Sequence, residues 1–258
     1  MVNEITTEKK ALWRLIVVGG HTRSIGKTQL VCDVIRAFPR VGWIAGKITQ
    51  YGHGVCARNG ENCDCAPEEH VCALDWETQS DTGTDSARFL QAGAQRSFWL
   101  RTKQGYLAQG LPLLRKTLRE VESDRVDSSL GAKAHQGQAG DVGAKAPNRG
   151  ATESEGPRAV IVESNSLMQF AKPSLYFAVI DPLKDDFKQS AQMALDRAHA
   201  LVLRGEVGDN PPAPLWMKFP ERLMREKPSV LHREGERLPE PLWELVHRIL
   251  EQPPDAKI

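Results

Sequence analysis

The chain has 258 residues, of which 40% are hydrophobic, and this composition is sufficient for the core of one α/β domain. A formal net charge of +1 argues against nucleic acid or a membrane as a partner, because the protein has no overall field that would attract either. We expect a cytoplasmic protein, since the N-terminus lacks a signal-peptide pattern and no apolar run approaches the ~20 residues of a membrane span.

Strand and helix patterns alternate along the chain. Leu12–Val18 is a short apolar strand pattern that ends at Gly19-Gly20, and Thr28–Phe38 has its apolar residues at helical spacing. Further on we predict, in chain order, a strand at Val41–Thr49, a helix at Ser86–Ala94, a strand at Arg96–Thr102, a long helix at 106–123, strands ending at Glu163, Asp181 and Arg204, a helix at 188–200 between the last two strands, and an amphipathic helix at 236–252. The alternation predicts an α/β fold with a doubly wound, mainly parallel sheet, which binds ligands at the carboxyl ends of its strands.

One segment breaks this pattern. Residues 124–157 are rich in Gly, Ala, Ser and charged residues and contain almost no large apolar side chain. Such a composition cannot bury enough apolar surface to offset the entropy cost of ordering. We therefore predict a disordered insertion within a single domain that spans residues 1–258.

The segment between the first strand and the first helix is typical of a P-loop, the phosphate-binding loop of many nucleotide-binding proteins. Its backbone N–H groups at 22–28 would surround a β-phosphate at the helix N-terminus, where the helix dipole favours negative charge. Lys27 would reach the β and γ oxygens, and the Thr28 hydroxyl would hold Mg²⁺. The alternative is a glycine turn that merely ends a strand. The residues that we expect to contact the nucleotide here are Gly20, Thr22, Arg23, Ser24, Ile25, Gly26, Lys27, Thr28 and Gln29.

A P-loop enzyme also needs a carboxylate near its metal ion. Glu163 follows four apolar residues and would emerge at the ligand-binding edge of the sheet, so it is the first candidate. Asp181 ends a strand in the same way and is the second candidate. Either acid could instead cap the turn that follows its strand. We predict catalytic roles for Lys27, Thr28 and Glu163.

Three motifs resemble known families. The loop has one residue more than the usual G-x4-G-K-T, and its G-x5-G-K-T spacing, which starts at Gly20, resembles dethiobiotin synthetase. GTDSARFLQAGA at 83–94 resembles the P-G-K-D-S-x-R-x-x-x-A-G-A motif of the molybdopterin-guanine dinucleotide biosynthesis protein B family. That family also has a strand that ends in a lysine, here Lys47, and a later strand that ends in an acid, here Glu163.

The second resemblance implies a nucleotide-binding, Mg²⁺-dependent protein that assists a protein partner in cofactor assembly. It adds Lys47 and Asp85 to the expected nucleotide and metal site, although Asp85 could instead be only the N-cap of its helix. The first resemblance implies an ATP-dependent enzyme that acts on a small carboxylic acid, and it places base contacts near Gly205–Pro211. The chain lacks an N-K-x-D guanine motif, so GTP and ATP both stay open, as does the oligomeric state, including a homodimer.

A cysteine-rich insertion is expected at residues 50–80. Four of the five cysteines lie within it at C-x6-C-x-C-x6-C spacing, a density that chance does not explain. Four thiolates could hold Zn²⁺ and so fold a loop that has no core of its own, and an iron–sulfur cluster takes the same ligands. Free or redox-active thiols are the remaining alternative. The predicted ligands are Cys56, Cys63, Cys65 and Cys72, whereas Cys32 is predicted to be a core residue.

Overall fold

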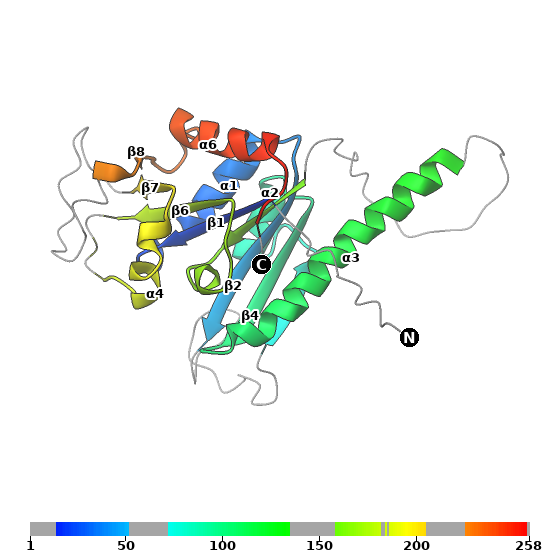
Figure 1. The fold of residues 1–258 in the computed structure, drawn as a ribbon, viewed down its shortest axis with the longest axis horizontal. Helices are drawn as coiled ribbons and strands as arrows, with labels where there is room; N and C mark the ends of the chain where they lie inside the picture. The colour runs from blue at the N-terminus through cyan, green and yellow to red at the C-terminus, as the bar shows by residue number, and fades with distance from the viewer. Residues whose placement is uncertain are drawn as a thin grey trace, which may run out of the picture.

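A computed structural model describes residues 14–51, 72–134, 158–181, 184, 186–204 and 225–256, and it has the predicted α/β architecture (Figure 1). The eight strands of its sheet lie in the order β3-β4-β2-β5-β1-β6-β7-β8. All neighbouring strands are parallel except β3 and β4, which are antiparallel. The strands are β1 (Leu15–Gly20), β2 (Gly42–Tyr51), β3 (Cys72–Glu77), β4 (Arg96–Lys103), β5 (Arg158–Glu163), β6 (Leu175–Ile180), β7 (Ala200–Leu203) and β8 (Ser229–Leu231).

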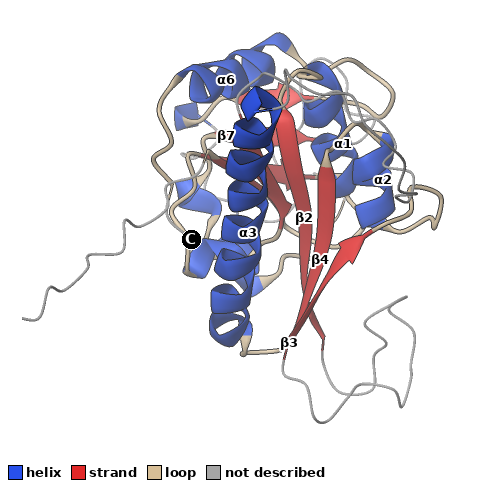
Figure 2. Cartoon of the chain, turned by 90° about the vertical axis from the view of Figure 1, so that its right-hand side faces the viewer, coloured by secondary structure: helices blue, strands red, loops and turns tan. Residues whose placement is uncertain are grey.

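Helices cover both faces of the sheet. The longer helices are α1 (Lys27–Ala37), α2 (Asp85–Gln91), α3 (Leu107–Ala134) and α6 (Glu240–Glu251), and the short ones are α4 (Gln189–Gln192) and the 3-10 turns Ser166–Gln169 and Leu195–Arg197. Figure 2 shows α3 on one side of the strands, with α1 and α2 on the other. None of the described helices combines the length and apolarity that a membrane crossing requires.

The central strand β1 has buried side chains on both faces, as expected for a parallel strand between two helical layers. Leu15 and Val17 belong to the core under α3, whereas Ile16 and Val18 belong to the core under α1 and α6. The alternation of these residues follows from the two-residue period of a strand. The sheet therefore holds the carboxyl end of β1, and the loop that follows it, between two packed layers.

Several predicted elements differ from the structure. The first strand continues through Gly19 and Gly20, so these glycines are in β1 and not in a turn. The predicted helix at 188–200 is broken into α4 and a 3-10 turn, where the N–H groups of Ala194 and Ala198 form tighter i to i−3 hydrogen bonds. The strands β3 and β8 at the two edges were not predicted.

Two predicted insertions also have different boundaries. Helix α3 continues to Ala134, well into the range 124–157 for which we predicted disorder, and residues 135–157 lie outside the described residues. The cysteine-rich range 50–80 includes the edge strand β3, where Trp76 packs edge-to-face on Phe98 with ring centroids 6.0 Å apart. The pairing with β4 orders this segment, and its residues alternate so that Leu74 and Trp76 pack against the core.

Candidate functional site

The loop between β1 and α1 has the backbone conformation of a tight turn into a helix. Ser24 and Gly26 have left-handed φ angles of 50° and 82°, and Gly26 is the N-cap of α1. Glycine adopts this conformation without the steric cost that a Cβ atom imposes. Helix α1 therefore begins at Lys27, at the carboxyl edge of the sheet, and its first N–H groups have no partner within the helix.

Gly20 is required by close packing and not by a turn. A Cβ atom at this position would lie 2.6 Å from Cδ1 of Ile25 and 3.0 Å from Cδ of Lys27. Its backbone N–H donates to Oδ1 of Asn165 and its carbonyl accepts from Nδ2, both at 2.7 Å. Asn165, which we did not predict as a site residue, thus fixes the start of the loop from the segment after β5. The sequence signal that could have identified it is its position two residues after the acid that ends β5.

Lys27 lies over the loop and bonds to its backbone. Its Nζ donates to the carbonyl of Thr22 at 2.8 Å, so the ammonium group spans the turn. Burial lowers the pKa of Lys27 to about 8, although the nearby Glu163 carboxylate acts in the opposite direction. A partly desolvated ammonium group of this kind gains stability when an anion approaches it.

Thr28 and Glu163 are in direct contact. The Thr28 hydroxyl donates to Oε2 of Glu163 at 2.6 Å, and the glutamate is 5% exposed. The sheet register explains the contact, because Glu163 is the last residue of β5 and pairs with Val18 of β1 on one side and Lys47 of β2 on the other. A hydroxyl and a carboxylate at this edge are both oxygen ligands that suit Mg²⁺.

Two further predicted residues lie beside Glu163. Nζ of Lys47 is 3.5 Å from Oε1 of Glu163 and forms a second ion pair with Asp85, the first residue of α2. Burial alone would lower the pKa of Lys47, but the carboxylates of Glu163 and Asp85 outweigh it and raise the pKa. The structure thus brings Lys47, Asp85, Glu163 and Thr28 together, although α2 follows β2 only after the cysteine-rich segment.

Asp85 is not the N-cap of α2. That position belongs to Thr84, whose Oγ1 accepts a hydrogen bond from the N–H of Ala87 at 3.1 Å. Because Thr84 caps the helix, the Asp85 carboxylate is available to Lys47. Arg88, one turn later, donates from Nη2 to Oε1 of Gln29 at 2.8 Å and so joins α2 to the first turn of α1.

The remaining predicted loop residues differ in their surroundings. Thr22 is buried and its hydroxyl donates to Asp186, whereas Ile25 is buried in the core and Arg23 is exposed. The carbonyl of Ser24 accepts a bond of 3.1 Å from Nζ of Lys184. Asp181, the second candidate for the metal carboxylate, lies with Lys184 and His21 and does not join the Thr28–Glu163 pair.

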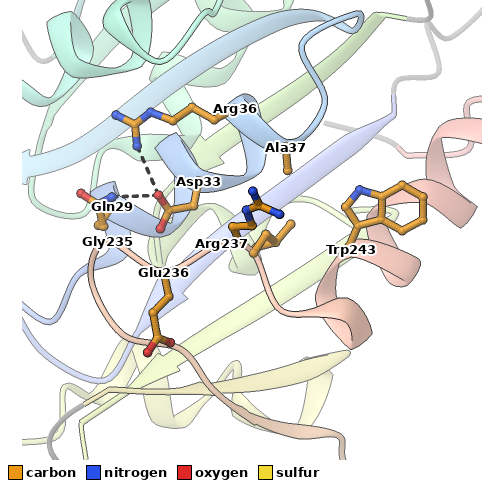
Figure 3. Close-up of a pocket in the computed structure, with 9 residues that line it drawn as sticks. Gln29, Asp33, Arg36, Ala37, Gly235, Glu236, Arg237 and Trp243 are labelled. Carbon is orange, nitrogen blue, oxygen red and sulfur yellow. Dashed lines mark hydrogen bonds and ion pairs between the residues drawn. The ribbon is translucent and has the colours of Figure 1, made fainter.

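A cavity of about 490 Å³ lies beside α1, between this helix and the chain that leads into α6 (Figure 3). Asp33 projects from α1 beside it, and its Oδ1 accepts from Nε2 of Gln29 at 2.8 Å and from Nη1 of Arg36 at 3.2 Å. Gln29 is the only predicted site residue that lines it. The full lining is Gln29, Asp33, Arg36, Ala37, Gly235, Glu236, Arg237, Leu238 and Trp243.

The predicted cysteine site falls mostly outside the described residues. Cys72 is a half-buried free cysteine on β3, whereas Cys56, Cys63 and Cys65 lie within the range that is not described. In the described ranges, no three His, Cys, Asp or Glu side chains form a group that could hold a metal ion. Cys32 is a core residue as predicted: it is 1% exposed, and burial raises the pKa of its thiol to about 11.

The site therefore belongs to an α/β protein with a helix N-terminus, a lysine, a hydroxyl and a carboxylate at the carboxyl edge of a mainly parallel sheet. Comparisons with models of protein families, with curated proteins and with solved structures find no match to this chain.

Proposed function

We propose that this protein is a P-loop NTPase, which binds a nucleoside triphosphate with Mg²⁺ at residues 20–29 and hydrolyses it slowly. The observation that carries the proposal is the contact between Thr28 and Glu163, in which the hydroxyl after the loop lysine donates at 2.6 Å to the acid that ends β5. A glycine turn that only ended a strand would have no reason to bring a buried carboxylate to the first turn of the following helix.

Each part of the proposed nucleotide site has a defined task. The N–H groups at the start of α1 donate to the β-phosphate, and Lys27 transfers its bond from the Thr22 carbonyl to the phosphate oxygens. Thr28 and Glu163 hold Mg²⁺, with Asp85 as a further oxygen donor, because hydroxyl and carboxylate oxygens suit this ion. The metal ion supplies neutralisation of the charge on the β- and γ-phosphate oxygens.

Lys47 separates the two carboxylates. Its ammonium group lies against both Glu163 and Asp85, so it offsets their mutual repulsion when no divalent cation is bound. If Thr28 and Glu163 held a metal ion, the Lys47 ammonium group would be available to contact the γ-phosphate. Lys27 and Lys47 would then stabilise the charge that develops as the γ-phosphate is transferred to water.

The resemblance to the molybdopterin-guanine dinucleotide biosynthesis protein B family favours a role in cofactor maturation. In this account the nucleotide state controls the interaction with a protein partner in the cytoplasm. Reduced thiols are normal in that compartment, so the Cys56, Cys63, Cys65 and Cys72 set would hold Zn²⁺ or an iron–sulfur cluster. The alternative, an enzyme of the dethiobiotin synthetase type, would transfer the γ-phosphoryl group to a small carboxylic acid.

Phosphate release from Mg·ATP and Mg·GTP distinguishes these two functions. A slow rate that small mono- and dicarboxylic acids leave unchanged supports the maturation role, whereas strong stimulation by one acid would support the synthetase-type enzyme. Lys27→Ala is the control, since release by this variant at the wild-type rate would show that the activity does not come from the loop. The outcome with both nucleotides also decides between GTP and ATP.

Elemental analysis with an absorption spectrum tests the cysteine site. One equivalent of zinc without visible absorbance, or iron with charge-transfer bands, would support a metal site and identify its metal. The control is a variant in which all four cysteines are replaced by serine. It lacks the proposed metal ligands and should lose the metal, whereas Lys27 and Glu163 of the nucleotide site are unchanged. Purified protein without either metal would contradict this part of the proposal.

A further inference from the structure

A buried arginine contacts the last residue of the loop, Gly26. Arg204 follows β7 directly and is 7% exposed. Its Nη2 donates to the carbonyl of Gly26 at 3.1 Å, and its Nη1 donates to the carbonyl of His232 at 2.9 Å. Its Nε is buried without a hydrogen-bond partner, and the guanidinium forms no ion pair with a carboxylate of the described chain.

The carbonyl that Arg204 holds belongs to the residue that opens α1. Gly26 has φ 82° and ψ 21°, and its carbonyl also accepts the first helical bond, from the N–H of Leu30 at 3.0 Å. A Cβ atom on Gly26 would lie 3.0 Å from Nε of Arg204. The guanidinium thus packs directly on the glycine, and its bond fixes the peptide plane that aims the N–H of Lys27.

A second contact from the same edge of the sheet reaches helix α1 two turns after Gly26. His232, the residue after β8, is fully buried, and its Nε2 lies 2.9 Å from Oδ2 of Asp33. The backbone of His232 joins the first contact as well, because its carbonyl accepts from Arg204. The residues that directly follow β7 and β8 therefore contact α1 at two positions, Gly26 and Asp33.

A buried cation without a paired carboxylate is costly, and burial accordingly lowers the pKa of Arg204. The carboxylates of Asp33, Glu234 and Glu236 act in the opposite direction. None of them forms an ion pair with the guanidinium in the described chain, so an anion bound at the loop that Gly26 ends would add a favourable interaction.

We propose that Arg204 is a positioning residue for the phosphate loop: it fixes Gly26 and contributes a permanent positive charge behind the bound phosphates. The inference rests on the proposed nucleotide function. It differs from that function because none of the loop motifs includes the end of β7. A lysine at this position would keep the charge but could not reach two carbonyls with a rigid planar fork.

The test compares Arg204→Met and Arg204→Lys with wild-type protein. The measurements are the dissociation constants for Mg·ATP and Mg·GTP and, without nucleotide, amide hydrogen exchange over residues 20–30. We expect binding to weaken about tenfold or more in Arg204→Met, with faster exchange confined to the loop and the first turn of α1. In Arg204→Lys we expect a smaller loss of affinity and a similar rise in exchange.

Arg158→Met is the matched control. Arg158 also donates to a backbone carbonyl, that of Val121 in α3 at 3.0 Å, but it is the first residue of β5 and lies at the opposite end of this strand from Glu163. This variant should bind nucleotide as the wild type does, with unchanged exchange at 20–30.

The outcomes separate the inference from the proposed function. Wild-type affinity and exchange in Arg204→Lys, or in a folded Arg204→Met, would overturn the positioning role even if Lys27→Ala abolishes binding. A wild-type protein that binds no nucleotide would overturn the proposed function and, with it, the role of the Arg204 charge. The exchange data would then still decide whether Arg204 holds Gly26. A rise in exchange spread over the whole sheet would mean a general loss of stability and would also count against the proposal.

Discussion

The Thr28 hydroxyl donates a 2.6 Å hydrogen bond to Oε2 of Glu163, a residue 135 positions away in the sequence. The contact exists because β1 and β5 are neighbours in the sheet, with Val18 opposite Glu163, so the helix that follows β1 starts beside the end of β5. A metal ion held here would lie at the N-terminus of α1, next to the phosphates that the loop is proposed to bind.

Glu163→Gln tests the metal role of this carboxylate. Glutamine can still accept the Thr28 hydrogen bond, but it removes the negative charge that a divalent cation requires. We expect the Mg²⁺ concentration needed for nucleotide binding to rise about tenfold or more, as for other losses of a charged ligand. Magnesium titrations at fixed nucleotide measure this, and Glu120→Gln on the exposed side of α3 is the control. Equal Mg²⁺ requirements in both variants would contradict the assignment.

Lys27→Met should stabilise the nucleotide-free protein at neutral pH. The folded state lowers the pKa of Lys27 from 10.5 to about 8. The unfolded chain therefore holds this proton more tightly, so stability is lower below pH 8 and rises between pH 8 and pH 10.5. Removal of the charge recovers at most about 3 kcal/mol at pH 7, less the lost bond to Thr22.

Urea unfolding of wild-type protein and Lys27→Met across pH 7 to 10.5 measures this difference. The stability advantage of the variant should shrink as the pH rises through this range, because the wild-type lysine becomes neutral in the folded state. Lys116→Met, at an exposed position of α3, should give no such trend. A variant that is less stable than the wild type at every pH would contradict the desolvation of Lys27.

Nucleotide affinity should depend on the protonation of Lys27. Below about pH 8 the lysine is charged and bonds to phosphate oxygens, and above this value the free protein must take up a proton to bind. The dissociation constant should rise up to about tenfold per pH unit above pH 8. Fluorescence titrations with a labelled nucleotide between pH 7 and 9.5 test this. A flat wild-type profile would refute the prediction.

Asn165→Asp should disrupt the start of the loop. The amide of Asn165 both donates to the Gly20 carbonyl and accepts from the Gly20 N–H, and a carboxylate can only accept. The substitution places a carboxylate oxygen opposite the Gly20 carbonyl oxygen, where the two repel each other, and it adds a negative charge near the phosphate site. We expect a stability loss of about 1–3 kcal/mol and a nucleotide affinity at least about tenfold weaker. Asn165→Gln, which keeps the amide, is the comparison, and an unaffected Asn165→Asp variant would show that the contact does not matter.

The sequence predicted those parts of the site that local pattern controls. The strand and helix periods around 15–37 place Gly26, Lys27 and Thr28 at a helix start, and the apolar run before Glu163 places this acid at the sheet edge. The sequence allows Asp85 two roles, and the structure shows that Thr84 supplies the cap. The edge strand β3 was not predicted although Leu74 and Trp76 alternate with polar residues, because a run of six residues inside a cysteine-rich segment is a short pattern and its pairing with β4 is a long-range contact.

The residues that the sequence did not indicate act through long-range contacts. Asn165 reaches Gly20 across 145 positions and Arg204 reaches Gly26 across 178. Neither lies in a motif, and each bonds to backbone groups, which carry no sequence signal. His232 and Asp33 are a third example, since both are buried polar residues and they lie 199 positions apart in the sequence. Their pairing depends on the β7–β8 edge, which cannot be placed without the complete sheet order.

Calorimetric titration of the full chain with Mg·ATP and Mg·GTP tests the central claim most directly. We predict one site per chain for at least one of the two nucleotides, with affinity lost in Lys27→Met while that variant unfolds cooperatively. The binding should also require Mg²⁺ and be weakened by Glu163→Gln. A wild-type protein that binds neither nucleotide, or a Lys27→Met variant that binds as tightly as the wild type, would contradict the account.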